Sequence, residues 1–76
     1  MTSPARVARP RFIGSNADAT LYIRDALTER GWGLVNAHRE SSRIMSFWHM
    51  RPAPSHDECH TLIALHARTP KEARNG

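Results

Sequence analysis

The sequence contains a single cysteine, Cys59, and a single lysine, Lys71, and it has no long run of apolar residues. One thiol cannot form an intrachain disulfide, which excludes a disulfide-rich secreted scaffold. The apolar stretches are a few residues long, far short of the ~20 residues that a membrane-spanning helix needs. No apolar segment follows the N-terminal arginines, as a secretory signal would require. We therefore expect a soluble, cytoplasmic protein without a membrane partner.

Acidic residues are missing from the first 14 positions, where Arg6, Arg9 and Arg11 lie among prolines. These three arginines account for most of the formal net charge of +4. A cationic segment ahead of a nearly neutral remainder favours an anionic partner over a small substrate. We predict a flexible basic arm over residues 1–10, a single domain over 11–68 and a polar C-terminal tail over 69–76.

The chain of 76 residues is also short. A domain of this size buries roughly 60% of its unfolded surface, so its stability is marginal. It has little room for a ligand pocket, which typically needs ~300 Å³ or more. These limits favour a binding module over a self-contained enzyme, and formation of a homodimer would relieve the shortage of core. Free-standing chains of this size often belong to phages or other mobile elements.

Two segments carry helix signals. Ser15 and Asp18 resemble a capping box, and the apolar residues that follow have helical spacing up to Gly31, a natural residue after a helix end. This pattern predicts a helix over 16–30, with an inner face made of Ala19, Tyr22, Ile23, Ala26 and Leu27. Ser55 and Glu58 form a second capping signal before an apolar stripe, which predicts a helix over 56–68 with Cys59, Leu62 and Ile63 inward.

The region between these helices predicts strands. Residues 32–39 and 43–50 are rich in strand formers, and the short polar segment 40–42 between them is typical of a β-hairpin turn. Phe12 and Ile13 add a possible edge strand over 11–14. The expected fold class is α+β, a small (β)-α-β-β-α domain with two helices packed on one face of a short antiparallel sheet. The hairpin register stays open, and both of its faces carry large apolar groups.

The five histidines and Cys59 are candidates for a metal site. His56 and His60 are four residues apart, the spacing that zinc-binding helices use. No CxxC or HExxH motif accompanies them, and Cys59 is expected to face the core as a small apolar residue. The sequence therefore predicts no metal and no cofactor.

Acid–base catalysis would require a positioned pair, for which the candidates are His38 with Glu40 and His49 with Asp57. Glu40 lies in the predicted turn, where a solvated charge is the ordinary explanation, and His49 lies near a strand end. We therefore expect no catalytic residues and a protein that is not an enzyme.

The order of predicted elements also resembles a known family. A helix, the segment Gly31-Trp32-Gly33-Leu34-Val35, a strand pair, Pro52 and a final helix are similar to HicA-type toxins. Those are small ribonucleases of toxin–antitoxin pairs with a fold like the double-stranded-RNA-binding domain. The family's Gly-Ser-His segment with its catalytic histidine is replaced here by residues 39–43, so the resemblance transfers no active site.

The preferred prediction is a small basic, non-catalytic binding protein that acts as an adaptor or inhibitor of a larger protein or nucleoprotein with an acidic surface. Arginines would meet anionic groups and Trp48 would be the apolar anchor, because both residue types are common at interface hot spots. The predicted contacts are Arg6, Arg9, Arg11, Arg39, Arg43, Trp48 and Arg51. The alternative is a nucleic-acid-binding domain, specifically an RNA binder or a HicA-like ribonuclease, because aromatic and basic residues alternate over 43–51.

Overall fold

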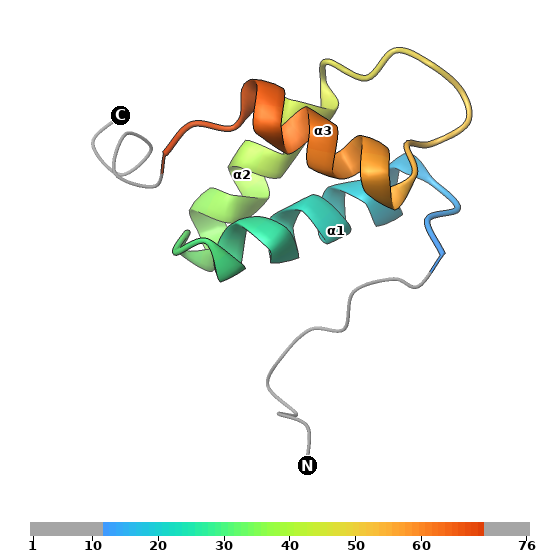
Figure 1. The fold of residues 1–76 in the computed structure, drawn as a ribbon. Coiled ribbons are helices and arrows are strands. Elements are labelled where there is room, and N and C mark those ends of the chain that lie inside the picture. Colours follow the sequence, from blue (N-terminus) through green and yellow to red (C-terminus); the bar gives the residue numbers. More distant parts are fainter. Residues whose placement is uncertain (1–11, 70–76) are drawn as a thin grey trace.

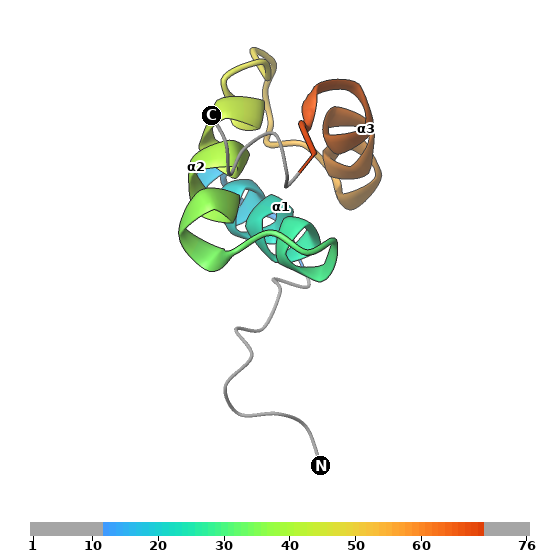
Figure 2. The same cartoon turned by 90° about the vertical axis from the view of Figure 1, so that its left-hand side faces the viewer.

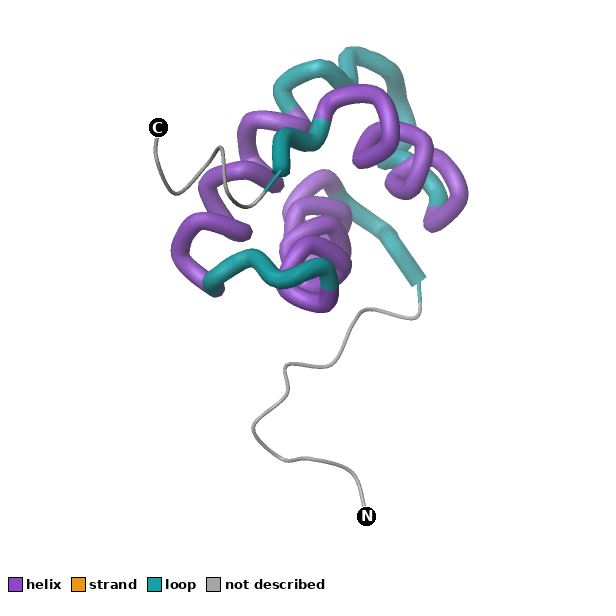
Figure 3. Tube along the Cα trace, turned by 60° about the vertical axis from the view of Figure 1, so that its left-hand side comes forward, coloured by secondary structure: helices purple, strands orange, loops and turns teal. Residues whose placement is uncertain are grey.

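The computed structural model describes residues 12–69, in which three α-helices follow one another: α1 (Asn16–Glu29), α2 (Leu34–Met45) and α3 (His56–His66) (Figure 1). This part of the chain contains no strand (Figure 3). The predicted α+β fold is therefore wrong, since the residues assigned to the hairpin form α2 and the segments around it. The predicted arm over 1–10, Arg11 and nearly all of the predicted tail lie outside the described residues.

Helix α1 forms where the sequence predicts it. The Ser15 side chain accepts a hydrogen bond from the Asp18 backbone N–H at 3.2 Å, which satisfies one of the free donors at the helix start. The buried face contains the five apolar residues expected from the helical spacing, Ala19, Tyr22, Ile23, Ala26 and Leu27. The helix ends before Gly31, whose φ of 103° is readily adopted by glycine and rarely by other residues.

Helix α2 explains why the hairpin prediction failed. Its buried residues are Ala37, Glu40, Ser41 and Ile44, at helical spacing i, i+3, i+4 and i+7. Only two of the four are apolar, so apolar spacing alone does not reveal the buried face, although the segment as a whole is amphipathic. Glu40 and Ser41 can be buried because each has partners: Glu40 binds two arginines, and the Ser41 hydroxyl donates to the His38 carbonyl at 2.7 Å.

The predicted edge strand over 11–14 is also wrong where the structure describes it. Residues 12–14 form no ladder, and the Phe12 side chain is 81% exposed. Ile13 is half-buried and packs against the core. Of these two apolar neighbours, only Ile13 contacts the core, just before α1 begins. A strand also needs a partner strand, and residues 12–69 contain none.

Helix α3 has a complete capping box. The Ser55 side chain accepts from the Glu58 N–H at 3.2 Å, and the Glu58 carboxylate accepts from the Ser55 N–H at 2.8 Å. Cys59, Leu62 and Ile63 are buried, as the apolar stripe predicts. The helix ends at His66, two residues earlier than expected, because Ala67 is extended and directs the chain toward α2.

The three helices share one core, with α1 at its base. Figures 1 and 2 show α2 and α3 lying side by side across α1, and α2 packs on α1 more extensively than α3 does. Trp32, in the turn between α1 and α2, belongs to the same core, and only 5% of the residue is exposed. The segment 46–55 arches from α2 to α3 (Figure 1) and buries Pro54. Within residues 12–69, no helix has the length and apolar character needed to cross a bilayer.

Candidate binding site

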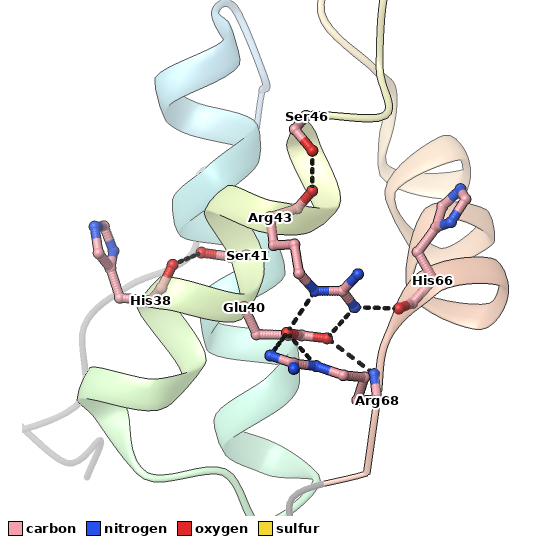
Figure 4. A network of polar contacts seen from close by, with 7 residues as sticks. All are labelled: His38, Glu40, Ser41, Arg43, Ser46, His66 and Arg68. Carbon is pink, nitrogen blue, oxygen red and sulfur yellow. Dashed lines mark hydrogen bonds and ion pairs between the residues drawn. The ribbon is translucent and has the colours of Figure 1, made fainter. Parts of the chain in front are cut away.

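The most organised polar feature is a buried carboxylate held by two arginines, which we call the Glu40 clasp: Glu40, Arg43 and Arg68 (Figure 4). Arg43 donates from Nε and Nη2 to the two carboxylate oxygens at 2.9 and 2.6 Å. Arg68 donates from Nε, Nη2 and its backbone N–H at 3.1, 2.8 and 2.9 Å. Arg43 also donates to the His66 carbonyl at the end of α3. The clasp therefore joins α2 to the C-terminal end of α3.

The clasp keeps Glu40 ionised although its side chain is fully buried. Burial alone would raise the pKa of Glu40, but the hydrogen bonds from Arg43 and Arg68 outweigh it and lower the pKa from 4.5 to about 2. The carboxylate in turn raises the pKa of Arg43. Glu40 and Arg43 therefore stay charged at neutral pH, and the clasp contains two arginines for one carboxylate.

An aromatic pair lies next to the clasp. The rings of Phe47 and His66 are stacked with centroids 4.0 Å apart and planes within 1° of parallel. The guanidinium carbon of Arg43 lies over the Phe47 ring, 5.9 Å from its centroid. Arg39 lies one turn before Arg43 on α2, since residues four apart share a helix face. Together these residues define a basic–aromatic stripe: Arg39, Arg43, Phe47, His66 and Arg68.

The outer face of α2 has no exposed acid. Glu40 is the only acidic residue of this helix, and it is 1% exposed. The exposed side chains of the helix are Leu34, Val35, His38, Arg39 and Ser42. Exposed carboxylates occur elsewhere, at Glu29 and at the N-terminal end of α3 on Asp57 and Glu58. Positive charge and exposed apolar groups are thus brought together on the surface formed by α2 and the end of α3.

The structure separates the predicted contact residues into three groups. Arg39 and Arg51 are exposed, whereas Arg43 is engaged in the clasp with 36% of its side chain exposed. Trp48, the predicted anchor, is half-buried and packs against the core, and its Nε1 donates to the Pro52 carbonyl at 3.2 Å. Arg6, Arg9 and Arg11 lie outside the described residues.

Sequence reasoning missed Phe47, His66 and Arg68 as members of one site. The spacing of Glu40 and Arg43, three residues apart, is a helix signal that could have identified their ion pair once a helix was considered. No local signal connects Arg68 to Glu40, since 28 positions separate them and only the return of the chain after α3 brings them together.

The other two histidines of α3, His56 and His60, contact α1. The Tyr22 hydroxyl lies 2.8 Å from Nε2 of His60, and the Tyr22 ring contacts the imidazole of His56 at a centroid distance of 4.6 Å. The four-residue spacing of these histidines therefore serves contact between α1 and α3. Among residues 12–69, no group of three or more His, Cys, Asp or Glu side chains could hold a metal ion.

The candidate catalytic groups are dispersed. Glu40 is ionised inside the clasp, and His38 lies exposed on the outer face of α2. His49 and Asp57 are both exposed, and no direct contact joins them. Cys59 is fully buried, and desolvation, followed by the nearby charge of Glu58, raises the pKa of its thiol to about 11. A thiol in this state is a poor nucleophile.

Comparison of the chain with known protein families, curated proteins and solved structures finds no match. The fold implied by the resemblance to HicA-type toxins requires a sheet, and residues 12–69 have none. Over these residues, the fold and site define a class: a three-helix domain with a basic–aromatic surface.

Proposed function

We propose that this protein is a non-catalytic adaptor or inhibitor that binds the acidic surface of a larger cytoplasmic protein. The observation that carries this proposal is the basic–aromatic stripe, in which the partly exposed Arg43 lies over the exposed Phe47 ring and α2 has no exposed acid. Arginine and aromatic side chains are enriched where protein interfaces concentrate their binding free energy. Leu34, Val35 and Leu65, which are 57%, 66% and 70% exposed, supply further apolar area to the same two helices.

A photocrosslinking experiment tests the proposal. A benzophenone side chain is placed at Ser42, on the outer face of α2, and in a control protein at Thr61, which is exposed on α3. In nuclease-treated lysate of the native host, we expect one protein crosslink from position 42 that is absent from position 61. The same crosslink should be absent in the Arg39→Glu variant. It should form again when the protein with unmodified Arg39 is mixed with the purified partner. Identical crosslinks from both positions, or none from position 42, would contradict the proposal.

Binding to nucleic acid is the second candidate, and one observation favours it. Helix α2 follows α1 after a four-residue connection and presents an acid-free outer face with Arg39, which resembles the way a helix-turn-helix domain presents its recognition helix. The test is titration of labelled RNA and duplex DNA at several salt concentrations. Micromolar binding with a clear salt dependence would support this candidate and overturn the protein-partner proposal.

A further inference from the structure

We infer that the Glu40 clasp and the Phe47–His66 stack form a subsite for an acidic peptide segment in which a carboxylate lies next to an apolar side chain. This inference rests on the proposed function, because it names the chemistry of the partner at part of the same surface. The carboxylate would bind the outer edges of Arg43 and Arg68, and the apolar side chain would contact the exposed surface of the Phe47 ring.

The first observation is the pattern of donors that the clasp leaves free. Glu40 occupies Nε and Nη2 of both guanidinium groups. Within residues 12–69, neither Nη1 has a hydrogen-bond partner, and the side chains of Arg43 and Arg68 are 36% and 48% exposed. Two arginines already fixed by a buried carboxylate lose little conformational entropy when they bind a second one.

The second observation is the apolar surface beside these donors. Phe47 is 45% exposed although His66 stacks on its ring and the Arg43 guanidinium lies over it. His66 therefore covers one face of the ring, and the exposed part belongs to its edge and its other face. An aliphatic or aromatic side chain next to a bound carboxylate would meet this exposed ring surface, because contact between apolar groups removes both from water.

The same geometry disfavours a nucleic acid at this subsite. A nucleobase binds an aromatic side chain by stacking on its face, and His66 already occupies one face of the Phe47 ring. Affinity for a phosphate backbone rises with the number of full positive charges, whereas Glu40 cancels one of the two arginine charges. A single carboxylate beside an apolar group matches the reduced charge and the exposed ring surface better than a run of phosphodiesters does.

The test is an NMR titration of the full chain, with ¹⁵N and ¹³C labelling. The probe is an N-acetylated, C-amidated hexapeptide with Glu-Leu at its centre and Gly and Ser around it. We expect it to shift the side-chain Nε–H resonances of Arg43 and Arg68 and the ring resonances of Phe47. Peptides with Gln in place of Glu, or Ser in place of Leu, should bind about tenfold more weakly, the loss typical of one removed hot-spot contact.

Two variants and a control complete the experiment. Phe47→Ser should weaken binding of the Glu-Leu peptide to the level of the Glu-Ser peptide, and because Phe47 is exposed, the circular dichroism spectrum should not change. Arg30→Lys alters an exposed arginine between α1 and α2 and should bind as the unmodified chain does. Equal binding of all three peptides would overturn the inference. So would a uridine oligonucleotide that shifts the same resonances at lower concentration.

The crosslinking experiment separates failure of this inference from failure of the proposed function. If the peptides fail while position 42 still crosslinks one protein in an Arg39-dependent manner, the subsite is wrong and the protein-binding function stands. If neither experiment gives binding, both proposals are wrong.

Discussion

At the scale of single residues, Glu40 connects α2 with the chain that follows α3. It is a charged side chain at a core position, and five hydrogen bonds from Arg43 and Arg68 make that burial tolerable. Removing one member of a buried ion pair leaves the other charges without their partner, and this loss exceeds the net contribution of the intact pair.

We therefore expect Glu40→Gln to lower the free energy of unfolding by about 3 kcal/mol. The measurement is urea unfolding followed by circular dichroism. Asp57→Asn is the control, because Asp57 is an exposed acid in the first turn of α3 and its loss should cost less than about 1 kcal/mol. Similar values for the two variants would show that the clasp does not stabilise the fold.

The low pKa of Glu40 gives a pH-dependent form of the same prediction. A carboxyl whose folded pKa is about 2, against 4.5 when unfolded, stabilises the fold above pH 4.5 and loses that effect as the pH falls toward 2. The difference in unfolding free energy between the unmodified chain and Glu40→Gln should therefore be about 3 kcal/mol at pH 7. It should shrink steadily between pH 4.5 and 2. A difference independent of pH would contradict the assignment.

Only part of the site could be predicted from the sequence. Arg39 and Arg43 could be chosen from charge alone, whereas the selection of Trp48 as anchor rested on its residue type. The site contains Phe47, His66 and Arg68 because α3 returns the chain to α2, and a long-range return of this kind leaves no local pattern. Sequence reasoning found part of the positive charge and missed the aromatic pair that lies beside it.

At the scale of helices and turns, capping and apolar spacing agree for α1 and α3, and both could be predicted. Helix α2 was missed although its segment is amphipathic, because half of its buried face is polar and its N-cap residue, Gly33, provides no side-chain cap. Residues such as Trp32, Val35, Ile44 and Phe47 have high strand propensity, and tertiary contacts overrode that preference. Burial of Glu40 and Ser41 is a property of the folded molecule, so the polar segment 40–42 was interpreted as a turn.

The turn between α1 and α2 provides a matched pair of glycines. Gly31 has a φ of +103°, whereas Gly33 has a φ of −69°, and a Cβ at either position would meet no atom within 4 Å. We expect Gly31→Ala to destabilise the fold by about 1 kcal/mol or more, because alanine resists the left-handed conformation.

Gly33→Ala is the control and should stay close to the unmodified chain, since its backbone conformation suits any residue. The measurement is the thermal midpoint of both variants. If Gly33→Ala is the more damaging change, backbone strain at Gly31 does not determine the turn.

At the scale of the whole molecule, α1 supports both other helices, and the domain has one small core. Ile23 is completely buried in it, and replacing a buried isoleucine by alanine costs about 2–5 kcal/mol. Because a domain this small has only marginal stability, we expect Ile23→Ala to unfold at a much lower urea concentration than the unmodified chain.

Circular dichroism and the fluorescence of Trp32 and Trp48 should report that unfolding together, since all three helices share the core. Leu65→Ala, at an exposed position on α3, is the control and should change stability by less than about 0.5 kcal/mol. Retention of most of the helical signal after the tryptophan fluorescence of Ile23→Ala has changed would mean that the helices are stable independently of one another.

The stacked rings of Phe47 and His66 also give the molecule an internal spectroscopic reporter. Their near-parallel arrangement at 4.0 Å places the imidazole protons of His66 in the shielding region of the phenyl ring current. Those protons should resonate upfield of the imidazole protons of His38, which is exposed on α2. Any ligand that separates the end of α2 from the end of α3 would move the signal downfield, so occupancy of this surface could be followed without an attached label.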